Sequence, residues 1–233
     1  NRLLIFHIQS LIGSVTKMAP KLFYTELSPP ARSTLLTAQA IGLDLDLKNV
    51  DLSVGEHMAP EYLKMNPQHT VPTLDDNGYF LWDSHAINMY LVGKYAKDDS
   101  LYPRDPQKRG IVDQRLFFCA SVVQARLAAI VGPILRQGEK TIAQEKIDNV
   151  HIAYDLLEIF LGDHDYVAGD SLTIADLSIV AHLASLSGLI PIAQNKYRRL
   201  SKWMHRMQQL PYYEEANQVG SDKLVGFLQS KLV

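Results

Sequence analysis

The chain has 233 residues, 47% of them hydrophobic, which is enough apolar material for a sizeable core, and no uninterrupted apolar run approaches the roughly 20 residues that span a bilayer. A formal net charge of −2 and the lack of a dense Lys/Arg cluster argue against a nucleic-acid partner. The single cysteine, Cys119, rules out an intramolecular disulfide and fits a reducing compartment such as the cytoplasm.

Residues 1–17 (NRLLIFHIQSLIGSVTK) do not have the pattern of a targeting segment. Their apolar stretch is interrupted by His7, Gln9 and Ser10, no small-residue cleavage site follows it, and a mitochondrial presequence would carry more arginine. We expect this extension to pack poorly and the folded part to begin at Met18.

Residues 18–98 carry the pattern of an α/β domain. Residues 22–24 form a short apolar run typical of a buried strand, and a helix is predicted from the proline pair at 29–30 to Gly42. Residues 43–47 alternate leucine with charged residues, which is the period of a strand. Two strands joined through a helix are expected to be parallel.

The remainder of this domain predicts a hairpin between two helices. A short helix is expected at 61–63, and the apolar segments 71–74 and 79–82 flank Asn77-Gly78, a strong hairpin-turn signal. A further helix is expected from 83 to about 95. The order β-α-β-α-β-β-α predicts a thioredoxin-like fold.

Beyond a break at 97–103 the strand signals end, and residues 104–233 predict an all-helical second domain. The expected helices cover roughly 106–136, 142–161, 173–187, 196–208 and 220–230. Pro133 predicts a kink in the first of them, and Thr173 with Asp176 predicts a variant of the capping box at the start of the third.

Ser28 stands directly before the two prolines, and on its own it predicts only a helix N-cap. His57 and the segments 66–72 (NPQHTVP) and 83–87 (DSHAI) add to it. Together with the helical second domain these motifs resemble the cytosolic glutathione transferases, in particular the insect epsilon class. The related delta class tends to carry Glu-Ser-Arg-Ala-Ile at 83–87. The resemblance extends from residue 21 to the end of the chain.

This resemblance implies a role for each matched residue. Val71–Pro72 would form a cis peptide whose backbone pairs with the cysteinyl part of glutathione, as a short extra strand. Asp83 and Ser84 would hold the γ-glutamyl end. His57, His69 and Arg126 would complete the glutathione contacts, the two histidines at the glycyl carboxylate. Some epsilon enzymes carry a second arginine at the position occupied here by Ala128.

The resemblance also implies that Ser28 holds the glutathione sulfur as a thiolate. A thiol with a pKa near 8.5 is only about 3% ionised at pH 7, and lowering the pKa by about two units, or about 2.7 kcal/mol, makes the thiolate predominant. A hydroxyl donating to a charged group contributes about 1.5–3 kcal/mol, and a helix N-terminus about 0.3–1 kcal/mol. These two contributions suffice without a general base.

Small hydrophobic electrophiles would bind between the two domains. The implied lining comprises Leu27, Phe118, Val122, Ile130, Leu224 and Phe227, each of which is equally compatible with core or interface packing. Cys119 lies on an apolar helix face and is expected to be buried. The histidines and the cysteine show no metal-ligand spacing, so no metal site is expected.

The expected activity is conjugation of glutathione to xenobiotic electrophiles such as insecticides, by a cytoplasmic homodimer. Dehydrochlorination and peroxide reduction are expected side activities, because both use the same thiolate. One alternative is a non-catalytic scaffold of the same fold that binds glutathione or a lipophilic ligand. A serine hydrolase is disfavoured, because the chain has no Gly-x-Ser-x-Gly motif.

Overall fold

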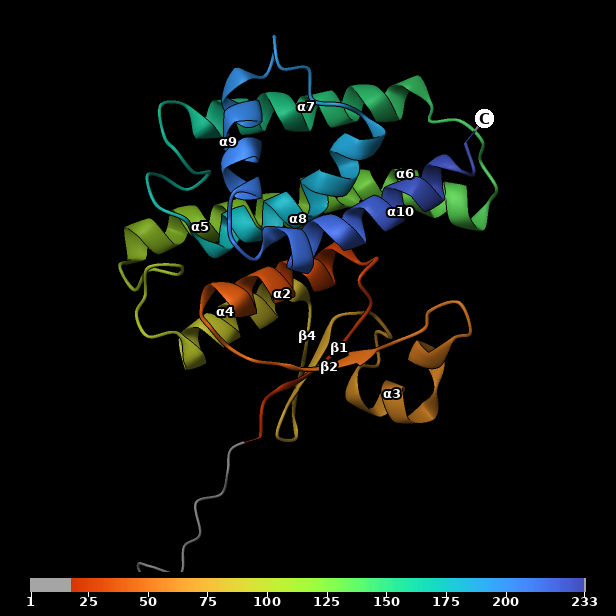
Figure 1. The fold of residues 1–233 in the computed structure, drawn as a ribbon, viewed down its shortest axis with the longest axis vertical. Helices are drawn as coiled ribbons and strands as arrows, with labels where there is room; N and C mark the ends of the chain where they lie inside the picture. Colours follow the sequence, from red (N-terminus) through yellow and green to blue (C-terminus); the bar gives the residue numbers. More distant parts are fainter. Residues whose placement is uncertain (1–17, 233) are drawn as a thin grey trace, which may run out of the picture.

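The computed structural model describes residues 18–232, so the expected extension 1–17 lies outside the described residues. A four-stranded sheet with its helices forms one part of the molecule, and a stack of longer helices forms the other (Figure 1). We refer to them as the α/β part and the helical part.

The strand order in the sheet is β2-β1-β3-β4. The strands are β1 (Lys21–Tyr24), β2 (Asp46–Asn49), β3 (Thr73–Asp76) and β4 (Tyr79–Trp82). β1 and β2 are parallel, as predicted, and the other neighbours are antiparallel. The β3–β4 hairpin turns at Asn77 and Gly78, whose φ angles of 57° and 89° are the two positive values that a type I′ turn needs.

β2 begins later than its leucine alternation predicts. Leu43 and Leu45 are half-buried and pack against the sheet core without belonging to the strand, whereas Leu47 is 42% exposed. The ladder starts where Lys21 of β1 pairs with Asp46. The first backbone hydrogen bond of this pair runs from Asp46 N to the Pro20 carbonyl at 2.9 Å.

Two helices cover one face of the sheet. α2 (Pro29–Ala40) and α4 (Ser84–Tyr95) lie between the sheet and the helical part, whereas η1 (Glu56–Met58) and α3 (Pro60–Met65) lie away from it (Figure 1). The small core beneath α4 consists of Leu22, Leu74, Ile87 and Leu91, each with no exposed surface. This order and packing confirm the thioredoxin-like prediction.

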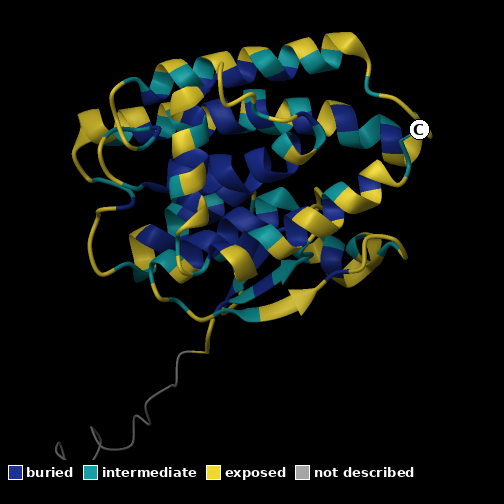
Figure 2. Cartoon of the chain, turned by 45° about the horizontal axis from the view of Figure 1, so that its top comes forward, coloured by how far each residue is buried: buried dark blue, intermediate teal, exposed yellow. Residues whose placement is uncertain are grey.

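The helical part follows the predicted segments to within two residues at each end. Its elements are α5 (Pro106–Phe118), η2 (Cys119–Gln124), α6 (Ala125–Arg136), α7 (Gln144–Leu161), α8 (Ile174–Leu189), α9 (Arg198–Gln208), η3 (Glu214–Gln218) and α10 (Val219–Gln229). α8 is the central helix, and every residue from Ile174 to Leu186 is buried (Figure 2). A helix that is apolar around its whole circumference is typical of such a position.

The first long helix, residues 106–136, is continuous, but its middle section η2 is π-helical. This irregularity lies upstream of Pro133, the residue at which the sequence predicts a kink. By length and hydropathy alone, this helix could cross a membrane. Leu116, Cys119, Val123 and Leu127 pack into the core of the helical part, so we interpret it as a core helix.

The predicted cap of α8 is present with aspartate in place of the usual glutamate. Asp176 accepts hydrogen bonds from the backbone N–H of Thr173 (2.9 Å) and of Val167 (2.9 Å), and from Nε1 of Trp203 (2.9 Å). Thr173 in turn accepts from Ala175 N at 3.3 Å. The carboxylate therefore joins the start of α8 to α9 and to the preceding loop.

Candidate functional site

Ser28 is the N-cap of α2, at the turn that follows β1. Its hydroxyl accepts from Ala31 N at 3.4 Å and donates to the carbonyl oxygen of Val71 at 3.5 Å. Both distances are long for a hydroxyl group. The Ser28 hydroxyl is thus weakly held by the protein and can donate to a ligand at the helix N-terminus.

Val71 and Pro72 are joined by a cis peptide bond, as the resemblance implies. Pro72 is buried, Val71 is half-buried, and the Val71 N–H has no hydrogen-bond acceptor among residues 18–232. The segment precedes β3, so an extended ligand could pair with this free N–H as an added strand.

A buried polar cluster fixes the turn before Val71. Asn66 donates through Nδ2 to the Thr70 carbonyl (3.0 Å) and to Thr73 Oγ1 (2.9 Å). The Tyr62 hydroxyl donates to the same Thr70 carbonyl at 2.6 Å. The role of these supporting residues was not predicted from the sequence, although asparagine before proline is a turn signal.

His57 and His69 come together from two different loops. Their ring centroids are 6.1 Å apart; His57 lies in η1, and His69 has a left-handed φ of 48°. Nδ1 of His57 is buried without a hydrogen-bond partner, and the His69 side chain is exposed. Two imidazoles so placed offer donors to a carboxylate.

Asp83 and Ser84 form the start of α4. Asp83 has a φ of 69°, unusual for a residue other than glycine, and its carboxylate accepts from the backbone N–H of His85 (2.8 Å) and Ala86 (3.3 Å). The hydrogen bond from the His85 side chain, helped by the backbone hydrogen bonds, outweighs the opposing effect of burial and leaves the pKa of Asp83 below its usual value. The Asp83 side chain is still 61% exposed, so the carboxylate is accessible to a cationic ligand group.

Next to Asp83 lies a buried histidine pair that no sequence motif predicts. His85 of α4 stacks on His182 of α8, with ring centroids 6.4 Å apart and planes at 12°. Burial lowers the pKa of His182 to about 3, so this ring is neutral. The buried Cys119 lies 3.6 Å from His182 Nδ1, and burial raises the pKa of its thiol. Cys119 is therefore an inert packing residue, as predicted.

Arg126 points away from these residues. Its Nε donates to the Asn149 carbonyl of α7 and its Nη1 donates to the Val122 carbonyl at 3.2 Å. α7 lies on the far side of the helical part from the sheet (Figures 1 and 2). The helix turns the Arg126 side chain toward α7 and leaves Ala128 exposed, and the expected glutathione contact of Arg126 stays a prediction.

The six residues expected to line the electrophile pocket divide into two groups. Phe118, Ile130 and Leu224 are 8%, 1% and 7% exposed and belong to the core of the helical part. Phe118 packs edge-on against Phe160 of α7, with ring centroids 4.9 Å apart. Leu27 (37%) and Phe227 (46%) are exposed, and Val122 is half-buried. Only the second group is accessible to a substrate.

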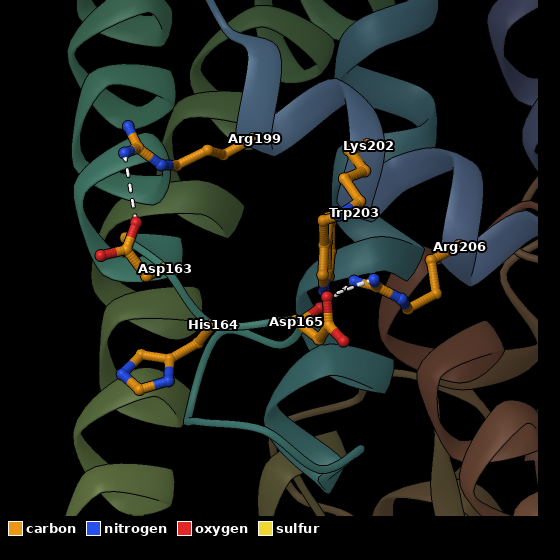
Figure 3. A pocket seen from close by; sticks show the side chains of 8 residues that line it. Asp163, His164, Asp165, Arg199, Lys202, Trp203 and Arg206 are labelled. Atoms are coloured by element: carbon orange, nitrogen blue, oxygen red, sulfur yellow. Dashed lines mark hydrogen bonds and ion pairs between the residues drawn. The ribbon is translucent and has the colours of Figure 1, made fainter.

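Two cavities lie elsewhere on the described part of the chain. The first, about 250 Å³, lies between α9 and the loop after α7, where Arg199 and Arg206 are directed at Asp163 and Asp165 (Figure 3). The second, about 420 Å³, lies at the C-terminal ends of α2 and α4, beside Tyr212. Neither includes Ser28. Within residues 18–232 no group of three His, Cys, Asp or Glu side chains could hold a metal ion.

Comparisons with known proteins identify relatives of this chain along most of its length. Residues 20–93 match the glutathione S-transferase N-terminal domain, and residues 118–211 match the glutathione S-transferase C-terminal domain. An epsilon-class glutathione S-transferase from the housefly, Musca domestica, is 48% identical with a TM-score of 0.90, over 91% of this chain and 98% of that chain. A glutathione transferase homologue from Drosophila mojavensis, solved with bound glutathione, is 46% identical with a TM-score of 0.89, over 92% and 98%. Glutathione S-transferase 1 of Manduca sexta is 41% identical over 217 residues, which cover 92% of this chain and 100% of that protein.

Proposed function

This chain belongs to the glutathione S-transferase family, and we propose that Ser28 is the residue that activates the glutathione sulfur. The protein is a transferase with glutathione as its co-substrate. The thiolate of glutathione attacks an electrophilic carbon of the second substrate, forms the carbon–sulfur bond and displaces the leaving group. A hydroxyl that donates to the sulfur favours the anionic form, which is the nucleophile.

The observation that carries the proposal is the approach of Ser28 to Val71. Their hydroxyl and carbonyl oxygens are 3.5 Å apart, so a cysteinyl residue paired with the Val71 backbone has its side chain within reach of Ser28. In this arrangement the γ-glutamyl ammonium binds Asp83, the γ-glutamyl carboxylate binds Ser84 and the N-terminus of α4, and the glycyl carboxylate faces His57 and His69.

The second substrate is proposed to be a small hydrophobic electrophile. Leu27, Val122 and Phe227 supply accessible apolar surface from the Ser28 turn, from η2 and from α10. Xenobiotic and insecticide detoxification, dehydrochlorination and peroxide reduction are proposed uses of the same thiolate. We also propose that the enzyme is a cytoplasmic homodimer.

The test is the variant Ser28→Ala, with Thr173→Ala as a matched control that removes a helix cap in the other part of the molecule. We expect Ser28→Ala to lower turnover of a chromogenic aryl halide by about 10²-fold, the order of effect of losing one preorganised donor, while glutathione binding persists. The ultraviolet absorbance of the bound thiolate at neutral pH should fall in parallel.

Equal turnover in Ser28→Ala and in the native enzyme would remove Ser28 from the mechanism. If the native protein binds glutathione without any thiolate absorbance or turnover, the scaffold alternative is correct instead. Thr173→Ala should retain both signals at temperatures where it is folded.

A further inference from the structure

A buried arginine stands one helical turn after Ser28. Arg32 is 1% exposed, and within residues 18–232 no carboxylate forms an ion pair with it. Burial lowers the pKa of Arg32 to about 10, so the side chain remains cationic at neutral pH. A buried charge without a counter-ion is costly, and it is retained only where neutral dipoles satisfy all its donors.

Each of the three guanidinium nitrogens has a different task. Nη1 donates to the carbonyls of Glu26 (3.0 Å) and Leu27 (3.2 Å), the two residues just before Ser28. Nε donates to Asn217 Oδ1 at 2.9 Å, in η3. Nη2 donates to two acceptors of α8, the Ala181 carbonyl (3.1 Å) and Ser185 Oγ (2.6 Å). The guanidinium thus ties the turn that carries Ser28 to two elements of the helical part.

A second contact holds the same turn from α10. A Cβ atom at Gly220 would overlap the carbonyl oxygen of Glu26 and would lie 3.0 Å from Cδ of Arg32. Lys223, also in α10, pairs with the Glu26 carboxylate at 2.7 Å. The backbone at Glu26 is therefore fixed between the Arg32 guanidinium and the main chain of α10.

We propose that Arg32 is a positioning residue for Ser28: held by α8 and η3, it fixes the Glu26 and Leu27 carbonyls and thereby the direction of the Ser28 hydroxyl. This inference rests on the proposed function of Ser28. The Ser28 hydroxyl has only long contacts of its own, at 3.4 and 3.5 Å, so its orientation depends on the backbone that carries it. Loosening that backbone weakens donation to the sulfur and raises the pKa of bound glutathione.

The first test compares two glycines of α10. Gly220→Ala pushes against the Glu26 carbonyl, whereas Gly226→Ala meets nothing within 4 Å. From the pH profile of kcat/KM for the electrophile, measured at saturating glutathione, we expect Gly220→Ala to raise the apparent pKa of bound glutathione by about one unit. Activity then falls about tenfold at pH values below both pKa values and converges on that of the native enzyme at alkaline pH. Gly226→Ala keeps the native profile.

The second test compares two arginines. Arg32→Lys removes the planar fork but keeps the charge, and Arg115→Lys does the same where Nε donates to the Val167 carbonyl at 2.8 Å, within the helical part. We expect only Arg32→Lys to move the glutathione pKa. If Arg32→Lys does not fold, Asn217→Ala, which removes the acceptor of Nε and keeps the guanidinium itself, replaces it.

The outcomes separate this inference from the proposal on which it depends. If Ser28→Ala raises the glutathione pKa but Gly220→Ala and Arg32→Lys (or Asn217→Ala) do not, the positioning role of Arg32 is refuted and the role of Ser28 stands. A uniform loss of activity at all pH values in these variants refutes it equally. If Ser28→Ala leaves the pKa unchanged, the proposed function itself fails.

Discussion

The two parts of the molecule differ in how many unfavourable backbone conformations their described residues adopt. The residues other than glycine with a positive φ among those described are His69, Asn77 and Asp83, and all of them lie in the α/β part. His69 and Asp83 are also proposed ligand contacts. Such conformations cost about 1–3 kcal/mol each and persist only where the surroundings fix them. The helical part has a continuous core and a fully buried central helix (Figure 2).

This difference indicates that the α/β part serves mainly ligand binding and the helical part mainly stability. The α/β part presents backbone groups and polar side chains in the conformations that a peptide-like ligand requires, over a small core. The helical part supplies a large packed core, and through Arg32 and the His85–His182 pair it supports the α/β part from behind. Substitutions in the helical part that contact neither Arg32 nor the Ser28 turn should therefore act mainly on stability, and those on the site surface mainly on binding.

The largest expected effect is on stability, at Asp176. Asp176→Ala removes the acceptor for the Val167 and Thr173 N–H groups and for Trp203 Nε1, all in a fully buried position. We expect the free energy of unfolding to fall by about 3–5 kcal/mol, measured by chemical denaturation. Asp170→Ala, at a side chain that is 79% exposed, should change it by less than about 0.5 kcal/mol. If Asp176→Ala lowers the free energy of unfolding by less than about 1 kcal/mol, the hydrogen bonds of Asp176 do not have the stabilising role assigned to them.

The next largest effect is on binding, at Asp83. Asp83→Asn keeps a residue that caps α4 and tolerates a positive φ, but it removes the charge that binds the γ-glutamyl ammonium. We expect the glutathione Kd to rise about 10- to 100-fold, with little change in unfolding free energy. Asp105→Asn is the matched control, since Asp105 caps α5 in the same way through Gln107 N and Lys108 N. Equal Kd values for the two variants contradict the site assignment.

Two buried aspartates, one in each part of the molecule, differ in how they make the free energy of unfolding depend on pH. At Asp176 burial outweighs the hydrogen bonds from Val167, Trp203 and Thr173 and raises the pKa. At Asp76, in contrast, hydrogen bonds from Lys94, Tyr90 and Tyr95 outweigh burial and hold the pKa below its usual value. The unfolded chain then binds a proton at Asp76 before the folded chain does, so the stability that it contributes is present above about pH 4 and is lost as the pH falls further.

The variant Asp76→Asn tests this difference. It should flatten the fall of unfolding free energy below about pH 4 by at most about 1.4 kcal/mol per pH unit, which is the limit for one proton. Denaturant midpoints measured along an acid series give this slope. An unchanged slope shows that Asp76 is not the carboxylate responsible.

The smallest expected effect separates the two helix caps. Thr173→Ala should lower the free energy of unfolding by about 1 kcal/mol and leave the pKa of bound glutathione unchanged. Ser28→Ala should cost less stability, because its cap bond to Ala31 N is long at 3.4 Å, and yet it should change that pKa. Thermal denaturation and a pH profile of both variants test this prediction. If Thr173→Ala changes the glutathione pKa and Ser28→Ala does not, the different roles assigned to the two parts are contradicted.

The features that depend on local chemistry could be predicted from the amino-acid sequence. Proline after Ser28, the Asn77-Gly78 pair and Thr173 with Asp176 act through the backbone of their immediate neighbours, and each produces the predicted turn or cap. The approximate extents of the helices follow from the spacing of apolar residues along the chain, since that spacing places them on the face of the helix that packs. The motifs around Ser28, His69 and Asp83 identified the family for the same reason, because each is contained within a few consecutive residues.

Which side of each helix faces the site depends on how whole elements pack, and it could not be predicted from the sequence. Arg126 and Phe118 turn toward α7, and Arg32 collects acceptors from residues as distant in sequence as Ala181 and Asn217. Periodicity shows that a helix has an apolar face, but when a helix packs on two sides it does not show which neighbour that face meets. Contacts between residues far apart in the chain arise from the packing of whole elements, and no short stretch of sequence encodes them.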